Sequence, residues 1–393
     1  MRISILLFIS LIFFSKIIAQ TFPGANNISG YIDKIKGKNI TIVANQTSLI
    51  SSTHIVDSLL SLNITIKNVF APEHGFRGNY GAGDIVSNET DPKTGIKVIS
   101  LYGKNKKPLP EQLKGIDVVV FDLQDVGLRF YTYISTLHYV MEACAENNIS
   151  LIVLDRPNPN GHYIDGPVLD TAYRSFIGMH SVPVVYGMTI GEYALMINGE
   201  GWLENGIQCK LDVIPCINYN HNAKYVLPVK PSPNLPNTRS IELYPTLCFF
   251  EGTPLSIGRG TNKPFQVVGH PLLKDKMPDN FNFTPLPSEG SAKPLQSGKI
   301  CYGYDFSLPA APQPGEWIDT IAGIKIELLI DLYSKFPDKN LFFNKDNFFD
   351  KLAGTAEFRK DIINGKSAAE IRKSWEPELN SFKEIRKKYL LYE

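Results

Sequence analysis

Two segments of the chain place a carboxyl group just after a predicted buried strand, which suits acid–base chemistry. Glu73 comes just after the apolar run 66–71, and Asp122 comes directly after the apolar run 116–121. A carboxyl half buried at a strand end loses solvation, which favours its protonated form and suits a general acid near neutral pH. Two such carboxyls on neighbouring strand ends suit cleavage of a glycosidic bond, in which one of them protonates the leaving oxygen. The structural alternative for Glu73 is an ion pair with Arg77 that clamps the loop.

Polar side chains near these carboxyls are candidate substrate ligands, namely His74, Gln124, Asp125, Arg129 and Tyr131. His74 leads into a glycine-rich stretch whose spacing matches neither a phosphate-binding loop nor a dinucleotide-binding fingerprint. Asp125 has a structural alternative as the cap of the following helix, a role worth about 1 kcal/mol. The alternative for Arg129 is an ion pair with Asp125 or Asp122. We favour a functional role for Asp122, because it lies closest to the strand.

A third group of candidates lies in the C-terminal half of the chain. Asn234 lies in a proline-rich loop, Glu251 follows it, and Arg259 stands between Gly258 and Gly260. A Gly-Arg-Gly sequence presents a guanidinium on a tight backbone, which suits a clamp for a carboxylate. Prolines stiffen the Asn234 loop, which serves a preorganised pocket and an ordinary rigid connection equally well. Each of these signals is weak by itself.

The N-terminal part of the chain alternates short apolar runs with helical patterns, as βαβ units do. Its apolar runs are rich in Val and Ile on consecutive positions, which is expected of parallel strands buried on both faces. In an open α/β sheet, ligands bind outside the carboxyl ends of the strands. Asn45, Glu73 and Asp122 all follow such ends, so we predict an α/β fold with a Rossmann-like, largely parallel sheet and a site at that edge. The predicted strands are 40–44, 66–71, 97–101, 116–121 and 151–154, and the predicted helices are 54–62 and 130–146.

The chain divides into three predicted segments. Residues 1–19 combine a basic start, a short apolar stretch and a small residue, which is the pattern of a secretory signal peptide. Residues 20–165 are the predicted Rossmann-like domain, and residues 166–393 a smaller α+β domain packed across its mouth. No later stretch is apolar for long enough to span a bilayer, so we expect an exported protein, periplasmic or extracellular, without a stable membrane anchor. In the second domain, helices are predicted near 189–200, 317–336, 366–375 and 378–391.

Charge and cysteine usage narrow the classes of ligand. Removal of residues 1–19 takes away two positive charges and no negative ones, which changes the formal net charge from +1 to −1. A near-neutral chain without a Lys/Arg run lacks the electrostatic footprint of nucleic-acid binding, so the expected partner is a small neutral or mildly anionic molecule. The five cysteines form no metal-type pair. We expect mostly buried thiols, with Cys209–Cys216 as the most plausible bridge.

Several motifs occur in order along the mature chain. They are Val43-Ala44-Asn45-Gln46-Thr47, Pro72-Glu73-His74-Gly75-Phe76-Arg77-Gly78, Phe121-Asp122-Leu123-Gln124-Asp125-Val126-Gly127-Leu128-Arg129-Phe130-Tyr131-Thr132-Tyr133, Asp155-Arg156-Pro157-Asn158-Pro159, Pro233-Asn234-Leu235-Pro236 and Glu251-Gly252-Thr253 to Gly258-Arg259-Gly260-Thr261. Together they resemble the exo-β-N-acetylmuramidase (NamZ-type) family, formerly a family of unknown function. The resemblance implies a Rossmann-like N-terminal domain, a smaller C-terminal domain and a cleft between them. It also implies an activity that needs no metal or organic cofactor and in which Glu73 is the catalytic acid.

That activity is the release of N-acetylmuramic acid from the non-reducing ends of muramyl disaccharides or short peptidoglycan fragments. Muramic acid carries a lactyl carboxylate, for which Arg259 or Arg129 is a reasonable partner. Its 2-acetamido group permits substrate assistance, in which Asp122 or Glu251 would orient the group. Two other hypotheses stay open. One is a non-catalytic periplasmic module that binds muramyl sugars, and the other is a metal-assisted hydrolase that uses His74, Asp122, Asp125 and Asp155.

Overall fold

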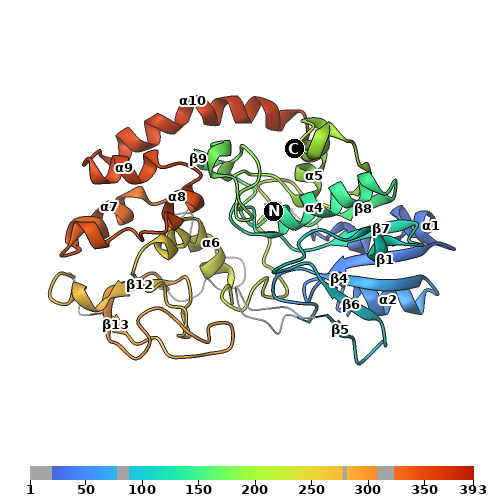
Figure 1. Cartoon of the computed structure of the whole chain (residues 1–393), viewed down its shortest axis with the longest axis horizontal. Helices are drawn as coiled ribbons and strands as arrows, with labels where there is room; N and C mark the ends of the chain where they lie inside the picture. Colours follow the sequence, from blue (N-terminus) through green and yellow to red (C-terminus); the bar gives the residue numbers. More distant parts are fainter. Residues whose placement is uncertain (1–19, 78–87, 278–280, 308–322) are drawn as a thin grey trace, which may run out of the picture.

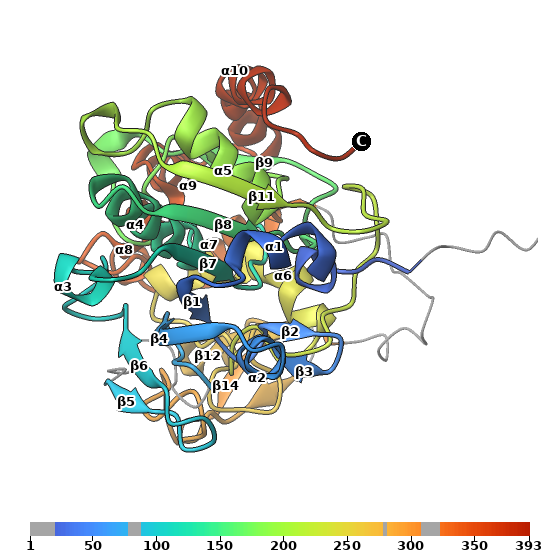
Figure 2. The same ribbon diagram turned by 90° about the vertical axis from the view of Figure 1, so that its right-hand side faces the viewer.

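The computed structural model describes residues 20–77, 88–277, 281–307 and 323–393, so the predicted signal segment lies outside the described residues. Its largest sheet has the strand order β11-β8-β7-β1-β4-β6-β5, which runs from top to bottom in Figure 2. Neighbouring strands are parallel, except that β5 runs antiparallel to β6. Numbered along the chain, the six parallel strands have the order 3-2-1-4-5-6 of a Rossmann sheet, which confirms the predicted fold class. The strands are β1 (Asn39–Ala44), β4 (Thr65–Ala71), β5 (Glu89–Thr90), β6 (Lys97–Ser100), β7 (Val118–Asp122), β8 (Ser150–Leu154) and β11 (Lys210–Ile214).

Helices cover both faces of this sheet. Val43 packs in the core on the side of α4 and α5, whereas its neighbour Ile42 packs on the side of α1 and α2. Successive side chains of a strand point to opposite faces, so a strand covered on both sides is apolar at every position. This is why the strands appear in the sequence as unbroken apolar runs. The helices are α1 (Ile32–Ile35), α2 (Ile55–Ser61), α3 (Pro110–Leu113), α4 (Tyr133–Glu146) and α5 (Ile190–Gly199), and the short strands β2 (Leu49–Ile50) and β3 (Thr53–His54) precede α2.

The sheet domain extends beyond the boundary predicted at residue 165. β11 pairs in parallel with β8, from Lys210 opposite Ser150 to Ile214 opposite Leu154. It is the last strand of the sheet on that side, and most of its residues are partly exposed. An edge strand of this kind lacks the continuous apolar run that marks a central strand. For this reason the predicted domain boundary at residue 165 leaves β11 in the second domain.

The second domain combines a small antiparallel sheet with helices, and it lies to the left of the large sheet in Figure 1. Its three strands have the order β12-β14-β13. The predicted helices 366–375 and 378–391 are one helix, α10, which continues through Pro377. The predicted helix 317–336 is observed from Ile326, and residues 317–322 lie outside the described residues. The elements are β9 (Asp165–Val168), β10 (Pro183–Val185), α6 (Thr238–Leu247), β12 (Val267–His270), β13 (Asn282–Phe283), β14 (Cys301–Asp305), α7 (Ile326–Lys335), α8 (Phe348–Ala353), α9 (Glu357–Ile363) and α10 (Ala368–Lys387).

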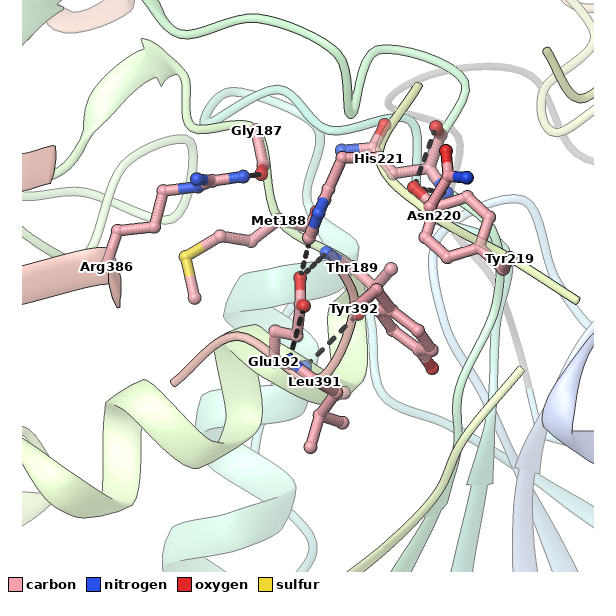
Figure 3. Close-up of polar contacts among 12 residues, drawn as sticks. Gly187, Met188, Thr189, Glu192, Tyr219, Asn220, His221, Arg386, Leu391 and Tyr392 are labelled. Carbon is pink, nitrogen blue, oxygen red and sulfur yellow. Dashed lines mark hydrogen bonds and ion pairs between the residues drawn. The ribbon is translucent and has the colours of Figure 1, made fainter. Parts of the chain in front are cut away.

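The C-terminal tail joins the two domains. α10 runs from the second domain toward α5, and the end of the chain lies beside the sheet domain (Figure 1). Figure 3 shows the carboxylate of Glu192 between the ring of His221 and the backbone of Leu391. The carboxylate accepts hydrogen bonds from His221 Nε2 at 2.9 Å and from the Leu391 amide at 2.8 Å. The Tyr392 hydroxyl donates to Asp155 Oδ2 at 2.5 Å.

All five cysteines are buried free thiols, so the predicted Cys209–Cys216 bridge is wrong. These two residues lie on either side of the five-residue strand β11. An extended strand of this length spans roughly 16 Å, whereas a disulfide needs Cα atoms within about 7 Å. Within the part of the chain that the structure describes, no helix has the length and apolar character needed to cross a membrane.

Candidate functional site

A tight turn at the carboxyl end of β4 presents Glu73. The Gly75 amide donates to the Pro72 carbonyl at 3.0 Å, which closes a four-residue turn. His74, the third residue of this turn, has a φ of +74°, which is the pattern of a type II turn and ordinarily selects Gly or Asn there. A buried histidine held in this conformation costs free energy. Such strain is typical of functional sites, where it fixes the direction of a neighbouring side chain.

The beginning of α4 holds Glu73 from the other side. Thr132 Oγ1 donates to Glu73 Oε2 at 2.7 Å, and the Tyr133 hydroxyl donates to the Glu73 carbonyl at 3.4 Å. Asn45, at the end of β1, donates from Nδ2 to the Tyr133 hydroxyl at 2.7 Å. The carboxyl ends of β1 and β4 and the N-terminus of α4 therefore meet at Glu73. Helix α4 begins at Tyr133, three residues after the predicted start, so that the Thr132 side chain faces the site.

Asn45 lies behind this group. Its side chain is fully buried, and its Oδ1 accepts from the Thr47 amide at 2.9 Å and from the Thr47 hydroxyl at 2.6 Å. These contacts make Asn45 a support for Tyr133, and its predicted contact with substrate stays a prediction. The alternative for Glu73 was an ion pair with Arg77 that clamps the loop. Arg77 instead pairs with Asp91, to which it donates from Nε at 3.3 Å and from Nη2 at 2.9 Å.

Asp122 forms a buried ion pair at the end of β7. Arg156 donates to its two oxygens at 2.6 Å from Nε and at 2.9 Å from Nη2, and neither side chain has appreciable exposure. Burial raises the pKa of the Asp122 carboxyl, and the Arg156 guanidinium offsets part of that rise. The catalytic role predicted for Asp122 is not supported by this position, because a two-bond pair with a guanidinium occupies both carboxylate oxygens. Asp122 instead ties the ends of β7 and β8 together.

Gln124 and Asp125 are buried in the loop after β7. Gln124 Nε2 donates to the carbonyls of Asp125 and Pro157, both at 2.8 Å. Asp125 accepts from the Gly127 amide at 2.6 Å and from the Tyr186 hydroxyl, so it stabilises the loop and does not cap α4. Burial raises the pKa of Asp125 to about 6. Direct contact of either side chain with substrate stays a prediction.

Arg129 serves the framework, which corrects its predicted role as a substrate ligand. Its guanidinium has no exposed surface and donates to four backbone carbonyls at 2.6–3.0 Å. Neither Asp125 nor Asp122 is its partner. A guanidinium that is enclosed by carbonyl oxygens cannot reach a substrate carboxylate. The four carbonyls belong to Pro167, Val182, Leu352 and Ala353.

Tyr131 and Asn234 connect the sheet edge with the second domain. The buried Tyr131 hydroxyl donates to the Pro231 carbonyl at 2.8 Å, and Gln46 reaches the same carbonyl at 3.3 Å. Further along this proline-rich loop, Asn234 Nδ2 donates to the Gly290 carbonyl at 2.8 Å. The structure thus brings Tyr131 to the loop predicted to form a pocket. The side-chain amide of Asn234 is therefore buried and bonded to a backbone carbonyl.

Arg259 and Glu251 meet at a cavity of about 670 Å³ that Gly290 also lines. Arg259 Nε donates to Glu251 Oε1 at 2.8 Å, and the guanidinium lies 4.9 Å from the centre of the Phe265 ring. Both glycines beside Arg259 have φ near +80°, and an added Cβ at Gly258 would lie 2.4 Å from a backbone carbonyl oxygen. The predicted tight turn around Arg259 therefore exists and directs the side chain to the cavity. The cavity lining carries Arg259, Lys293 and Glu251, so its net charge is positive.

The three aspartates that the metal-assisted hypothesis requires bond to different partners in the structure. Asp122 pairs with Arg156, Asp125 with Tyr186, and Asp155 with Thr189 and Tyr392. Across the described ranges, one cluster of three acidic groups has ligand atoms close together, and Lys107 already binds two of its members at 2.6 and 2.7 Å. That cluster consists of Glu142, Glu146 and Glu204.

The sequence reasoning assigned no role to Thr132, Tyr133 or Arg156, although each contacts a candidate residue. The partners of Tyr133 and Arg156 follow other strands, and one sequence does not show which strand ends meet. Thr132 has no local signal either, since the helical pattern places it inside the predicted helix 130–146 and not at an N-cap.

Comparisons with known proteins give one consistent result. Residues 40–239 match the family model described as "Exo-beta-N-acetylmuramidase NamZ, N-terminal", and residues 242–392 match its C-terminal counterpart. The chain is 40% identical over 381 residues to "Peptidoglycan beta-N-acetylmuramidase NamZ" of Bacillus subtilis, which covers 92% of this chain and 89% of the relative.

Two crystal structures of DUF1343 family proteins from Bacteroides fragilis have the same fold. The first is 44% identical with a TM-score of 0.85, and the second is 29% identical with a TM-score of 0.78. Each match covers 95% of this chain and 99% of the crystal structure's chain.

Proposed function

Because the chain belongs to the exo-β-N-acetylmuramidase NamZ family, we propose that it releases N-acetylmuramic acid from the non-reducing ends of peptidoglycan fragments, with Glu73 as the general acid. The observation that carries this proposal is the position of the Glu73 carboxyl. It lies at the carboxyl edge of a Rossmann sheet, in a strained turn, and a hydroxyl holds one of its oxygens at 2.7 Å.

The chemistry follows from this position. The carboxylic acid form of Glu73 gives its proton to the glycosidic oxygen while the bond to the anomeric carbon breaks. As that bond breaks, the 2-acetamido carbonyl oxygen of the sugar bonds to the anomeric carbon. Water later adds to the same carbon and opens the resulting ring, and its proton returns to the Glu73 carboxylate. Glu251 is the carboxylate that we propose to orient the acetamido group. Arg156 occupies both oxygens of the buried Asp122, whereas Arg259 donates only to Oε1 of Glu251, whose side chain is partly exposed.

The cavity beside Arg259 supports recognition of the lactyl carboxylate. Its lining is net positive, and its volume of about 670 Å³ lies within the range of ordinary small-molecule sites. A guanidinium fork compensates a desolvated carboxylate better than a neutral pocket does. We propose that Arg259 binds the lactyl group and that Glu251 keeps its guanidinium in place.

The test is turnover by Glu73→Gln. We expect kcat for a muramyl disaccharide to fall by about 10²–10⁴-fold, because general acid catalysis has this value. An aryl muramide with a good leaving group needs less protonation, so its loss should be smaller. Glu376→Gln, on the exposed side of α10, is the matched control and should have normal kcat. Normal turnover of the disaccharide by Glu73→Gln would remove Glu73 from the acid role.

The same assay separates the two other hypotheses. Wild-type protein that binds muramyl sugars without turnover would be a binding module. Loss of hydrolysis after extensive chelation, with recovery on addition of a divalent metal, would support a metal-assisted mechanism.

A further inference from the structure

We propose that Thr132 is a positioning residue, which orients the Glu73 carboxyl for proton transfer and forgoes its usual role as a helix cap. Thr132 occupies the N-cap position of α4. A threonine in this place ordinarily accepts a hydrogen bond from the backbone amide of the second or third helical residue. The inference rests on the proposed role of Glu73.

Among the described helices of ten or more residues, the other three whose N-cap side chain can accept a hydrogen bond show the usual arrangement. Thr189, Asn237 and Ser367 each accept a hydrogen bond from the third helical amide of α5, α6 and α10. Those three residues have an extended backbone, whereas the Thr132 backbone is itself helical and its side chain makes no such bond; its hydroxyl donates to Glu73 Oε2 at 2.7 Å. The Thr132 hydroxyl is thus directed away from its own helix and toward the candidate acid.

Ser135 supports the same conclusion. It is the third residue of α4, from which a side chain could reach back to the N-cap amide in a capping box. Its hydroxyl is buried and has no hydrogen-bond partner. Neither half of the local Thr-x-x-Ser pattern therefore serves the helix end. The helix loses a cap worth about 1 kcal/mol, and Glu73 gains a fixed donor.

The hydrogen bond from Thr132 determines the direction of the Glu73 carboxyl group. Tyr133 bonds the Glu73 carbonyl and Asn45 bonds Tyr133, so the backbone of Glu73 is anchored independently of its side chain. The Thr132 bond then fixes Oε2, and this sets where Oε1 points. Proton transfer requires a distance of about 2.6–3.2 Å between the acid and the leaving oxygen, and small misplacements of a reacting group reduce rates by up to about 10²-fold.

The experiment compares Thr132→Val with Thr132→Ser. Valine has the shape of threonine without its hydroxyl, so we expect kcat for a muramyl disaccharide to fall by about 10- to 100-fold with little change in KM. Serine keeps the hydroxyl and should restore kcat to within a few fold. An aryl muramide with a good leaving group should be affected less, since it depends less on the acid.

Stability measurements distinguish positioning from capping. Ser367→Ala removes a true cap of α10 and should lower the free energy of unfolding by about 1 kcal/mol without a change in kcat. Thr132→Val should lower kcat while it lowers stability by no more than Ser367→Ala does, because Glu73 is partly exposed and water can replace the lost donor. A loss of stability equal to that of Ser367→Ala, with unchanged kcat, would overturn the inference, and so would failure of serine to restore activity.

A double variant separates this inference from the proposed function. In a Glu73→Gln background, Thr132→Val should have almost no further effect on kcat, because a side chain without a proton to transfer gains nothing from being positioned. If the two losses multiply, Thr132 acts elsewhere and the inference is wrong. If Glu73→Gln alone is fully active, the proposed function of Glu73 fails first.

Discussion

Arg259 and Arg129 both bind oxygen atoms, but only Arg259 lines a cavity. Arg129 has no exposed surface, and backbone carbonyls accept the hydrogen bonds of its Nη1 and Nη2 atoms. Arg259 keeps about a fifth of its side-chain surface exposed and has one carboxylate partner, Glu251. A guanidinium has five donor hydrogens, so Arg259 can bind Glu251 and a second carboxylate together.

This difference predicts that Arg259→Ala selectively impairs muramide hydrolysis. Muramic acid has a lactyl carboxylate that N-acetylglucosamine lacks, so only the muramide leaves a desolvated charge without a partner. Loss of one member of such a pair costs about 2 kcal/mol or more, which is about 30-fold or more in kcat/KM. The measurement is the ratio of kcat/KM for a chromogenic N-acetylmuramide to that for the matching N-acetylglucosaminide.

Lys263→Ala is the control for this prediction, because Lys263 lies in the same loop and pairs with Asp305 at 2.7 Å. It should leave the ratio unchanged. If Arg259→Ala lowers both activities by the same factor, Arg259 acts on a group that the two sugars share or supports the loop.

At the residue scale, the types of the candidate residues were more predictable than their partners. Glu73 follows the predicted strand end, and Arg259 lies in the predicted tight turn. The strand end predicts a functional role for Asp122, and the guanidinium makes Arg129 a candidate partner of a carboxylate, yet Arg156 and four carbonyls bond to these side chains. Partners of this kind come from segments far away in the chain, and one sequence does not show which segments meet.

At the scale of elements, the strands of the sheet were predicted closely, because burial on both faces leaves a continuous apolar run. The sequence does not show where α4 begins or that β11 belongs to the large sheet. Residues 130–132 continue the apolar helical pattern but remain outside the helix, since Thr132 bonds Glu73 and Tyr131 bonds the Pro231 loop. Tertiary contacts therefore decided these boundaries against local propensity.

Arg129 joins three elements, which predicts a large loss of stability when it is replaced. Its guanidinium bonds carbonyls of β9, of the segment before β10 and of α8. Arg129→Met should lower the free energy of unfolding in urea by more than about 3 kcal/mol, because several buried carbonyls lose their donor. Arg129→Lys keeps the charge with fewer donors and should give an intermediate loss.

The matched control for this stability prediction is Arg174→Met, at an exposed position, which should change stability by less than about 0.5 kcal/mol. Soluble Arg129 variants should keep the preference for muramide over glucosaminide. A change in that preference at wild-type stability would return Arg129 to the substrate site.

At the scale of the whole molecule, the C-terminal tail connects the second domain to the carboxyl edge of the sheet. The Tyr392 hydroxyl bonds Asp155, which directly follows β8, and the next residue is Arg156, the partner of Asp122. The Leu391 amide bonds Glu192 at the start of α5. Contacts between residues more than 190 positions apart in the chain thus stabilise the same edge that carries the candidate site.

The contact between Tyr392 and Asp155 should depend on pH. Burial raises the pKa of Asp155 to about 7, and the hydrogen bond from Tyr392 opposes that rise. The folded carboxyl therefore binds its proton more tightly than the unfolded one, whose pKa is about 3.9. Proton binding by Asp155 therefore stabilises the folded protein in full below about pH 4, and this stabilisation is lost as the pH rises through about 7. Tyr392→Phe removes a donor that favours the ionised form, so it should destabilise the protein more at pH 8 than at pH 5.

Thermal unfolding at the two pH values measures this effect. Hydrogen bonds to charged groups contribute about 1.5–3 kcal/mol and those between neutral groups about 1 kcal/mol, so the decrease in Tm caused by Tyr392→Phe should be roughly twice as large at pH 8. Tyr139→Phe, on α4 and away from the tail, is the control and should show no such difference. An equal decrease at both pH values would mean that the Tyr392 hydroxyl does not act through the Asp155 carboxylate, and the tail would then hold the sheet edge by packing and by the Leu391–Glu192 bond.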